Sequence, residues 1–334
     1  MTLRKERIER GIKVRSDDIF IVRSWREMIY FGAPRLLPIV LLAGLVLTSN
    51  EYWQRVLIQA AVFALLGMSW DLLANCGLIS LGQALFFGIG AYISGSLNHY
   101  FGLTPLITIP LATLLGALLS VLVLVPVFRL RGIYFSMVTL VLPLMIERII
   151  EATDILGGTE GLTGLSTLPA FWIELSVIFI PLWACLFLLR RLIVSNYGVV
   201  IRAINDNDQS VINAGISLDL YKAQVVFIAG GIGAFCGAYM THAYQFVGMP
   251  VFALDYSILP IASVIVGGAG NFAGAILGAF ILVPLSELLR GIGGMRIVLY
   301  AIFLMVFVVL LPEGIFHFLQ RKYSQFERWV EVDK

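Results

Sequence analysis

Long uncharged apolar stretches dominate the chain. Residues 72–128 contain no Asp, Glu, Lys or Arg, and the same holds for residues 223–254 and 256–286. An α-helix needs about 20 consecutive apolar residues to cross the hydrocarbon core of a bilayer. A membrane β-barrel is excluded, because its strands would alternate apolar and polar residues over roughly ten positions. The pattern therefore predicts an all-α, polytopic membrane protein.

The spacing of polar residues predicts about ten transmembrane segments. They lie at about 36–49, 52–75, 77–97, 104–128, 131–152, 172–193, 221–244, 257–268, 269–289 and 295–312. The third contains several glycines and polar groups, and the eighth is short and ends in glycines, so both are expected to be broken helices. Because each half contains an odd number of segments, a duplicated half would insert with inverted topology. We therefore expect two inverted five-segment halves.

Most of the 23 Lys and Arg residues fall before residue 36, at 129–131, within 190–222, or after residue 320. Cytoplasmic loops carry an excess of these residues, and ten crossings place all four regions on one side. We therefore expect cytoplasmic termini, with an N-terminal segment over 1–35, a permease domain over 36–312 and a tail over 313–334. Residues 1–35 favour an amphipathic helix on the membrane surface, with a disordered basic segment as the alternative.

Composition narrows the function classes. Of the 334 residues, 59% are hydrophobic and 13% are charged, whereas a soluble domain carries about 25% charged residues. A net charge of +2 without a basic domain excludes a nucleic-acid-binding protein. The three cysteines and three histidines show no metal-ligand spacing, so no metal site is predicted. The histidines fall near predicted span ends, where their rings would meet the membrane interface. These six residues are Cys76, Cys185, Cys236, His99, His242 and His317.

No catalytic constellation is visible. The chain lacks a phosphate-binding loop, a nucleophile elbow and a zinc-protease motif, so we expect neither catalytic residues nor a cofactor in this chain. Asp71 and the adjacent Glu147 and Arg148 are the main charges inside predicted spans. Such charges are functional candidates by default, but a structural role is favoured here. Asp71, for example, could cap a neighbouring helix end.

Glycines and polar residues mark two candidate sites within the spans. Glycines spaced by four, such as Gly270, Gly274 and Gly278, favour close helix packing. The alternative is a solute route, because non-helical backbone at membrane depth is tolerated only where it is buried or lines a cavity. The candidate translocation residues are Asn75, Ser80, Gly82, Gln83, Gly88, Gly90, Gly267, Gly268, Gly270 and Asn271.

The longest predicted cytoplasmic loop, residues 195–220, contains two short helical patterns. Asp206 or Asn207 could cap the second helix at its N-terminus, and Gly215 could end it. A membrane-proximal helix pair with an apolar face must pack either on the chain's own spans or in a groove of another protein.

Four passages carry a family resemblance. They are Gly77 to Tyr92 (GLISLGQALFFGIGAY), Leu130 to Leu140 (LRGIYFSMVTL), Gly157 to Leu162 (GGTEGL) and Val266 to Asn271 (VGGAGN). In these passages, and over roughly residues 36–320, the chain resembles the membrane permeases of branched-chain amino acid ABC importers, the LivM type more than the LivH type. Permeases of urea, amide and aromatic-acid importers are similar.

The resemblance implies a non-catalytic, multi-pass subunit of the bacterial inner membrane. It implies three kinds of partner besides membrane lipid: a homologous LivH-like permease, two cytoplasmic ATP-binding subunits that use ATP and Mg, and an extracytoplasmic solute-binding protein. The loop would dock into the ATPases. The residues expected to couple the loop to the ATPases are Arg202, Ala203, Asn205, Asp206, Asn207, Asp208, Val211 and Ile212. A stand-alone secondary transporter and a membrane enzyme are the competing hypotheses.

Overall fold

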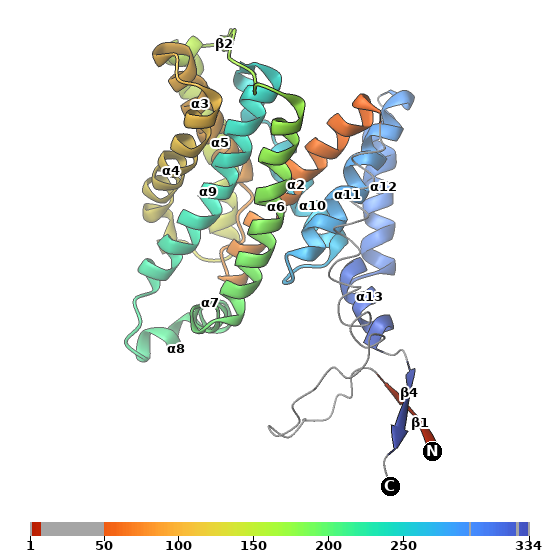
Figure 1. Cartoon of the computed structure of the whole chain (residues 1–334). Coiled ribbons are helices and arrows are strands. Elements are labelled where there is room, and N and C mark those ends of the chain that lie inside the picture. Colours follow the sequence, from red (N-terminus) through yellow and green to blue (C-terminus); the bar gives the residue numbers. More distant parts are fainter. Residues whose placement is uncertain (1, 8–49, 294, 325–326, 333–334) are drawn as a thin grey trace. The chain divides into compact units, whose positions relative to one another are not determined.

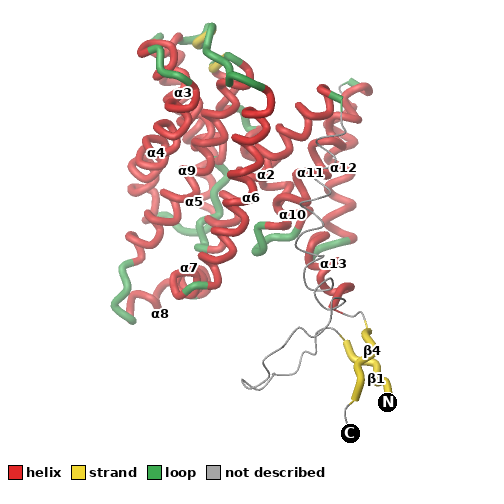
Figure 2. The backbone as a smooth tube through the Cα atoms, in the orientation of Figure 1, coloured by secondary structure: helices red, strands yellow, loops and turns green. Residues whose placement is uncertain are grey.

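The computed structural model describes residues 2–7, 50–293, 295–324 and 327–332, and these are mostly helical (Figures 1 and 2). The chain divides into a larger unit, Ile58–Phe316, and a smaller unit formed by Met1–Leu57 and His317–Lys334. The predicted span at 36–49 lies outside the described residues.

The larger unit contains the helical bundle. Its α-helices are α2 (Glu51–Asn75, which begins in the smaller unit), α3 (Gln83–Phe101), α4 (Pro105–Leu124), α5 (Ile133–Thr153), α6 (Phe171–Val194), α7 (Asn196–Asp206), α8 (Asp208–Asn213), α9 (Leu218–Tyr244), α10 (Asp255–Gly267), α11 (Ala273–Leu288) and α12 (Met295–Leu310). Short 3₁₀ helices are η1 (Val125–Arg129), η2 (Ile155–Gly157), η3 (Met249–Phe252) and η4 (Leu289–Ile292). A last helix, α13 (Gly314–Ser324), runs from the larger into the smaller unit.

Eight helical stretches in the described part of the chain are long and apolar enough to cross a membrane. They are Glu51–Asn75, Pro105–Arg129, Ile133–Thr153, Phe171–Val194, Leu218–Tyr244, Met249–Gly267, Ala273–Gly291 and Ala301–Arg321. The predicted multi-pass membrane protein is thus confirmed, whereas the count of ten segments and their inverted halves stay predictions.

Close helix packing builds the bundle. Helices α3, α4 and α9 pack against one another, and α10 packs against α11, while α2 is almost entirely enclosed. A Cβ atom at Gly90 of α3 would collide with the Ala234 backbone of α9, and one at Gly278 of α11 would collide with the Ser263 backbone of α10. The predicted packing role is therefore confirmed for Gly278, and Gly90, which was predicted as a translocation residue, packs in the same way, because only glycine lets the two backbones approach so closely.

The helices of the larger unit run between two ends (Figure 1). At one end, strand β2 (Leu162–Thr163) pairs antiparallel with β3 (Phe246–Val247), over a hydrophobic cluster that includes Tyr92, Ile150 and Phe252. We call this the β2–β3 end. Helices α7 and α8 lie at the other, which we call the α7–α8 end.

The smaller unit corrects the expectation for residues 1–35. Strand β1 (Thr2–Arg7) pairs antiparallel with β4 (Glu327–Val332), so residues 2–7 are not part of an amphipathic helix. The register sets Glu6 opposite Arg328 and Arg7 opposite Glu327, and residues of opposite charge at facing positions favour a strand pair. Residues 8–35, which carry most of the predicted helix, lie outside the described residues.

Candidate functional site

The chain is not helical between α2 and α3, over residues 76–82, which we call the first interruption. The predicted break in the third segment is confirmed, but the helix begins at Gln83 rather than at residue 77. Gly77 has a φ of +74°, a left-handed conformation that ends a helix at low steric cost. The chain therefore turns out of α2 at this glycine.

Side chains from neighbouring helices satisfy the backbone of the first interruption. The indole of Trp70 donates to the Ser80 carbonyl at 2.6 Å, and the Leu81 N–H donates to the Thr139 hydroxyl at 3.1 Å. Because non-helical backbone inside a membrane protein needs such partners, α2 and α5 hold this segment in one conformation.

The predicted translocation residues around the first interruption are mostly buried. Ser80, Gly82, Gln83, Gly88 and Gly90 are all inaccessible, and Asn75 is half-buried. A Cβ atom at Gly82 would collide with the Thr139 carbonyl, and one at Gly88 would collide with the Phe252 ring. These glycines therefore fill helix crossings within the chain itself.

Gln83 differs from its neighbours because its amide is only partly satisfied. Its Oε1 accepts from the Ser69 hydroxyl at 3.2 Å. Its Nε2 has no hydrogen-bond partner among the described residues.

Helices α10 and α11 are joined by residues 268–272, the second interruption. The predicted break at the glycines is confirmed, since α10 ends at Gly267, and Gly268 and Gly270 have φ values of +110° and +87°. Gly267 packs against the backbone of Gly274, Gly268 is buried, Gly270 is exposed and Asn271 is half-buried.

Asp71 joins α2 to the second interruption. One carboxylate oxygen accepts from the Gly270 N–H at 2.8 Å, and the other accepts from the Phe272 N–H at 3.1 Å. The side chain is 1% exposed, and it lies one turn before Asn75, whose amide donates to the Asp71 carbonyl. The expected structural role of Asp71 as a cap is confirmed, and the last turns of α2 border both interruptions.

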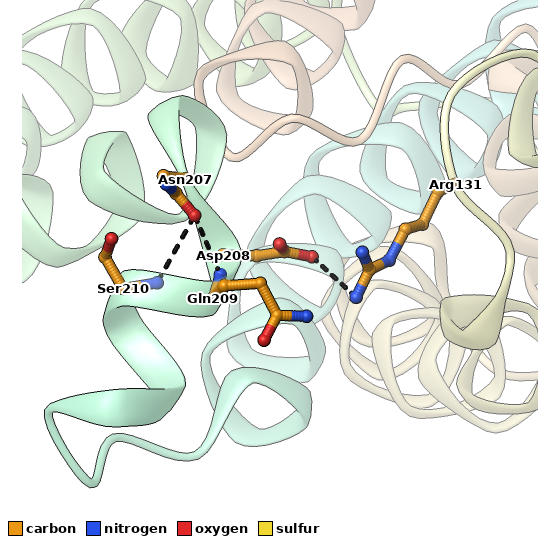
Figure 3. A network of polar contacts seen from close by, with 5 residues as sticks. All are labelled: Arg131, Asn207, Asp208, Gln209 and Ser210. Carbon is orange, nitrogen blue, oxygen red and sulfur yellow. Dashed lines mark hydrogen bonds and ion pairs between the residues drawn. The ribbon is translucent and has the colours of Figure 1, made fainter.

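The predicted loop folds as two short helices, α7 and α8, outside the membrane-spanning stretches. Asn207 caps α8, because its side-chain oxygen accepts from the backbone N–H groups of Gln209 and Ser210 (Figure 3). Gly215, with a φ of +79°, follows the end of α8. Both local predictions are confirmed, and Asn207 rather than Asp206 is the cap.

The loop is tied to the turn between α4 and α5. Asp208 lies 3.0 Å from the Arg131 guanidinium (Figure 3). Arg202 donates to the carbonyl of Ile193 at 3.2 Å, which anchors α7 to the end of α6. Ala203 is half-buried, and Asn205 and Asp206 are exposed.

The two apolar residues expected to contact another protein have different environments. Val211 is 5% exposed and is packed within this chain, whereas Ile212 is 45% exposed. Val211 is thus not available to seat in a partner in this conformation, because the α8 face that carries it packs on the chain's own helices.

Tyr197 adds a second anchor for the loop. Its ring stacks on Tyr221 of α9 with centroids 5.3 Å apart. Burial raises the pKa of Tyr197 to about 12, so the hydroxyl stays protonated and neutral at physiological pH.

The first interruption and the loop meet at a pocket of about 320 Å³. It is lined by residues 76–78, 130–132 and 204–208, together with Phe135 and Lys222. Gly77 faces Asn205 so closely that a Cβ atom would lie 3.1 Å from the Asn205 amide oxygen. The structure therefore brings together part of the predicted solute route and part of the predicted coupling region.

Lys222 is a lining residue that the sequence does not distinguish from the other basic residues within 190–222. It is 8% exposed and also lines an adjoining pocket of about 420 Å³. The available sequence signal was its position directly before the uncharged stretch 223–254. A lysine at a span end commonly extends its charge into water, so this position by itself did not predict that the residue is mostly buried.

His242 is a second residue whose surroundings were predicted wrongly from the sequence, which placed its ring at the membrane interface. It is fully buried rather than at an interface. Its Nε2 lies 2.9 Å from the Ser94 hydroxyl and 2.7 Å from the Thr108 hydroxyl, and its Nδ1 lies 2.8 Å from the Ser166 carbonyl. A carbonyl can only accept, so Nδ1 carries the proton. The network ties α3, α4 and α9 to the β2–β3 end.

Arg148, another predicted charge within the spans, forms a local contact. Arg148 pairs with Glu151 one turn later on α5. No group of three potential metal ligands from His, Cys, Asp and Glu occurs within the described residues.

Comparisons with known proteins agree on one family. Residues 52–311 match the family described as the permease component of branched-chain amino acid transport systems. The chain is 27% identical over 286 residues to the high-affinity branched-chain amino acid transport system permease protein LivM of Salmonella typhimurium, covering 76% of this chain and 67% of that protein. The LivM protein of Escherichia coli gives the same values.

An archaeal relative is also similar. The probable branched-chain amino acid transport permease protein LivM of Methanocaldococcus jannaschii is 25% identical over 240 residues, covering 64% of this chain and 68% of that protein. No solved structure matches the chain significantly.

Proposed function

The chain belongs to the branched-chain amino acid transport permease family, and on this basis we propose that it is a non-catalytic membrane subunit of an ABC importer for branched-chain amino acids. In this proposal it pairs with a homologous LivH-like permease in the bacterial inner membrane, with both termini in the cytoplasm. Two cytoplasmic ATP-binding subunits supply the energy of ATP hydrolysis with Mg, and an extracytoplasmic binding protein delivers the solute.

One observation carries the coupling part of the proposal, namely that the α7–α8 loop touches the first interruption. Gly77 and Asn205 are in close contact, and the Arg131–Asp208 pair links α8 to the start of α5. A displacement of the loop by an ATPase would therefore act directly on the segment between α2 and α3. Asn205, Asn207 and Ile212 are the exposed residues that we propose contact the ATPase, whereas Asp206, which is also exposed, lines the pocket beside them.

We place the solute route beside the two interruptions, on the side that faces the second permease. The buried glycines in these segments keep the backbones close together, and the polar groups of Asn75, Gln83 and Asn271 lie beside them. The substrate class follows the printed names of the relatives, which are all branched-chain amino acid permeases.

A stand-alone secondary transporter is less well supported. Such a protein needs an ionisable group near the midplane that can bind the coupling ion. Asp71 is the strongest candidate, but both of its carboxylate oxygens accept backbone hydrogen bonds from the second interruption. Because Asp71 is already used as a cap, we favour a subunit whose energy comes from partner ATPases rather than from an ion bound at Asp71.

The test is copurification of the ATPases with an Ile212→Asp variant. Ile212 is exposed, so the chain itself should fold and insert normally. A charge forced into an apolar contact with another protein costs several kcal/mol, and we expect loss of the ATPases and of leucine uptake. The matched control is Ile155→Asp at the β2–β3 end, since Ile155 is 51% exposed, and it should retain both ATPases. Normal copurification and uptake of the Ile212→Asp variant would contradict the proposed coupling contact.

A further inference from the structure

Lys222 is a mostly buried lysine whose side chain lines a pocket. It lies in the first turns of α9, is 8% exposed, and lines both the 320 Å³ and the 420 Å³ pockets. Among the described residues, no carboxylate forms an ion pair with its ammonium group and no acceptor hydrogen-bonds to it. The ammonium is not one of the inaccessible polar atoms that lack a partner, so it is open to the pocket and offers a positive charge that a ligand can neutralise.

The walls of the smaller pocket define what kind of ligand fits. Leu78, Phe135 and Ile204 are buried apolar residues along it. Its ionic groups balance in number, because two cations, Arg131 and Lys222, and two carboxylates, Asp206 and Asp208, are among the lining residues. Asp208 is already paired with Arg131, which leaves Lys222 and Asp206 to a ligand. One free cation, one free carboxylate and an apolar wall match a zwitterion with an apolar side chain.

We propose that Lys222 binds the carboxylate of an apolar amino acid in the 320 Å³ pocket, where the solute stops at the α7–α8 end before it leaves the protein. Asp206 faces the amino group of the solute, and Leu78, Phe135 and Ile204 pack against its side chain. The volume is at the lower end of the range for small-molecule sites, about 300–1,000 Å³. The assignment rests on the proposed function, and it adds a binding site to the membrane subunit itself.

The experiment is equilibrium binding of radiolabelled L-leucine to the purified complex of both permeases and both ATPases in lipid nanodiscs, without the binding protein. We expect Lys222→Met to weaken leucine binding about tenfold or more, the effect of one lost charge-assisted hydrogen bond. Methionine keeps the buried stem and removes the unpaired charge, so the fold should be retained. Isoamylamine, which is leucine without its carboxylate, should compete poorly with leucine for the wild-type complex.

A matched control distinguishes the specific effect of Lys222 from that of removing any nearby positive charge. Arg129→Met removes a neighbouring cation that lines only the larger pocket, and it should leave leucine binding unchanged. Leucine binding to Lys222→Met within twofold of wild type would overturn the proposal. So would competition by isoamylamine as strong as that by leucine, or by inorganic phosphate as strong as that by leucine. Loss of the ATPases from Lys222→Met with leucine binding intact would also overturn it, and would assign the lysine to the partner.

Uptake measured in parallel keeps the two proposals distinguishable. Reconstituted wild-type complex with binding protein and ATP should import leucine. If it imports leucine while Lys222→Met binds leucine normally, only the pocket assignment fails. If wild-type complex binds leucine through Lys222 but imports none, the proposed function fails and the pocket assignment stands.

Discussion

Asp71 shows how a single buried carboxylate can tie distant segments of a membrane protein together. Its two oxygens bind the Gly270 and Phe272 N–H groups, which precede the first turn of α11. Helix N-termini have unpaired N–H groups and a partial positive charge. The Asp71 carboxylate from α2 accepts hydrogen bonds from N–H groups at the start of α11 and is attracted by the partial positive charge there. It therefore fixes the second interruption to the centre of the bundle.

Asp71→Asn should destabilise the protein. An amide has one acceptor oxygen, so it cannot accept from both N–H groups, and loss of the bond to the buried Phe272 N–H would cost about 1–3 kcal/mol. The measurement is the midpoint of thermal unfolding in detergent, followed by size-exclusion chromatography after heating. As the control, Glu151→Gln removes one partner of an exposed ion pair, which typically contributes about 0.2–1 kcal/mol. Equal midpoints for Asp71→Asn and wild type would show that the cap is dispensable.

Single residues were predictable from sequence where the signal was local. Asn207 as a cap and Gly215 after the helix end follow from positions a few residues apart. Lys222 and His242 could not be placed in this way, because their surroundings come from distant segments. The partners of His242 are separated from it by 76, 134 and 148 residues. The sequence alone indicates a polar residue near a span end and contains no local sign of that network.

At the scale of elements, the crossing of α3 and α9 depends on glycines that face the opposite backbone. Gly90 faces Ala234, and Gly237 faces the Phe87 carbonyl. The two helices are thereby held close on both sides of the contact. Polar side chains such as Ser94 and Thr241 lie in the same region, and the Thr241 hydroxyl donates to the Ala91 carbonyl at 3.3 Å.

Gly90→Ala should weaken this crossing. Alanine favours an isolated helix over glycine by about 1 kcal/mol, but here its methyl group has no space, and overpacking costs about 1–3 kcal/mol. We therefore expect a lower thermal midpoint and a lower yield of correctly assembled protein. Gly291→Ala is the control, because nothing lies within 4 Å of the added methyl group. An unchanged midpoint for Gly90→Ala would mean that α3 and α9 can separate without loss.

Element boundaries were predictable where one helix fills one apolar stretch, as for α6 and α12. They were wrong where the backbone leaves the helix inside an apolar stretch. The segment predicted at 77–97 is a non-helical passage followed by α3, which extends to Phe101. Hydropathy cannot separate these states, since Leu78, Ile79 and Leu81 are as apolar outside the helix as inside it. The candidate site could not be predicted from local sequence either, because the contact of Gly77 with Asn205 joins segments 128 positions apart.

At the scale of the whole molecule, the larger unit has two differently built ends. The β2–β3 end is closed by a strand pair, a hydrophobic cluster and the His242 network. The α7–α8 end carries short helices, exposed polar residues and the two pockets. Our proposal assigns the first to the outside, where the binding protein would arrive, and the second to the cytoplasm.

Thiol labelling tests this assignment. Thr163→Cys and Asn207→Cys lie at opposite ends and both replaced side chains are exposed, whereas native Cys76 and Cys236 are buried. An impermeant maleimide added to intact cells should label Thr163→Cys, and should label Asn207→Cys only after the membrane is permeabilised. Wild type is the control for background labelling. Equal labelling of the two variants from outside would contradict the proposed topology.

The hydrogen bond between Asp71 and Gly270 can form only late in the synthesis of the chain. The two residues are 199 positions apart, and a ribosome adds about 5–20 residues per second. The carboxylate of α2 thus enters the bilayer about 10–40 s before its backbone partner has been made. During that interval the nascent chain contains a charge that lipid disfavours. In chains that stop before residue 270, the Asp71 carboxylate would stay without this backbone partner. A membrane protease or chaperone that recognises such a charge would distinguish these chains from finished ones.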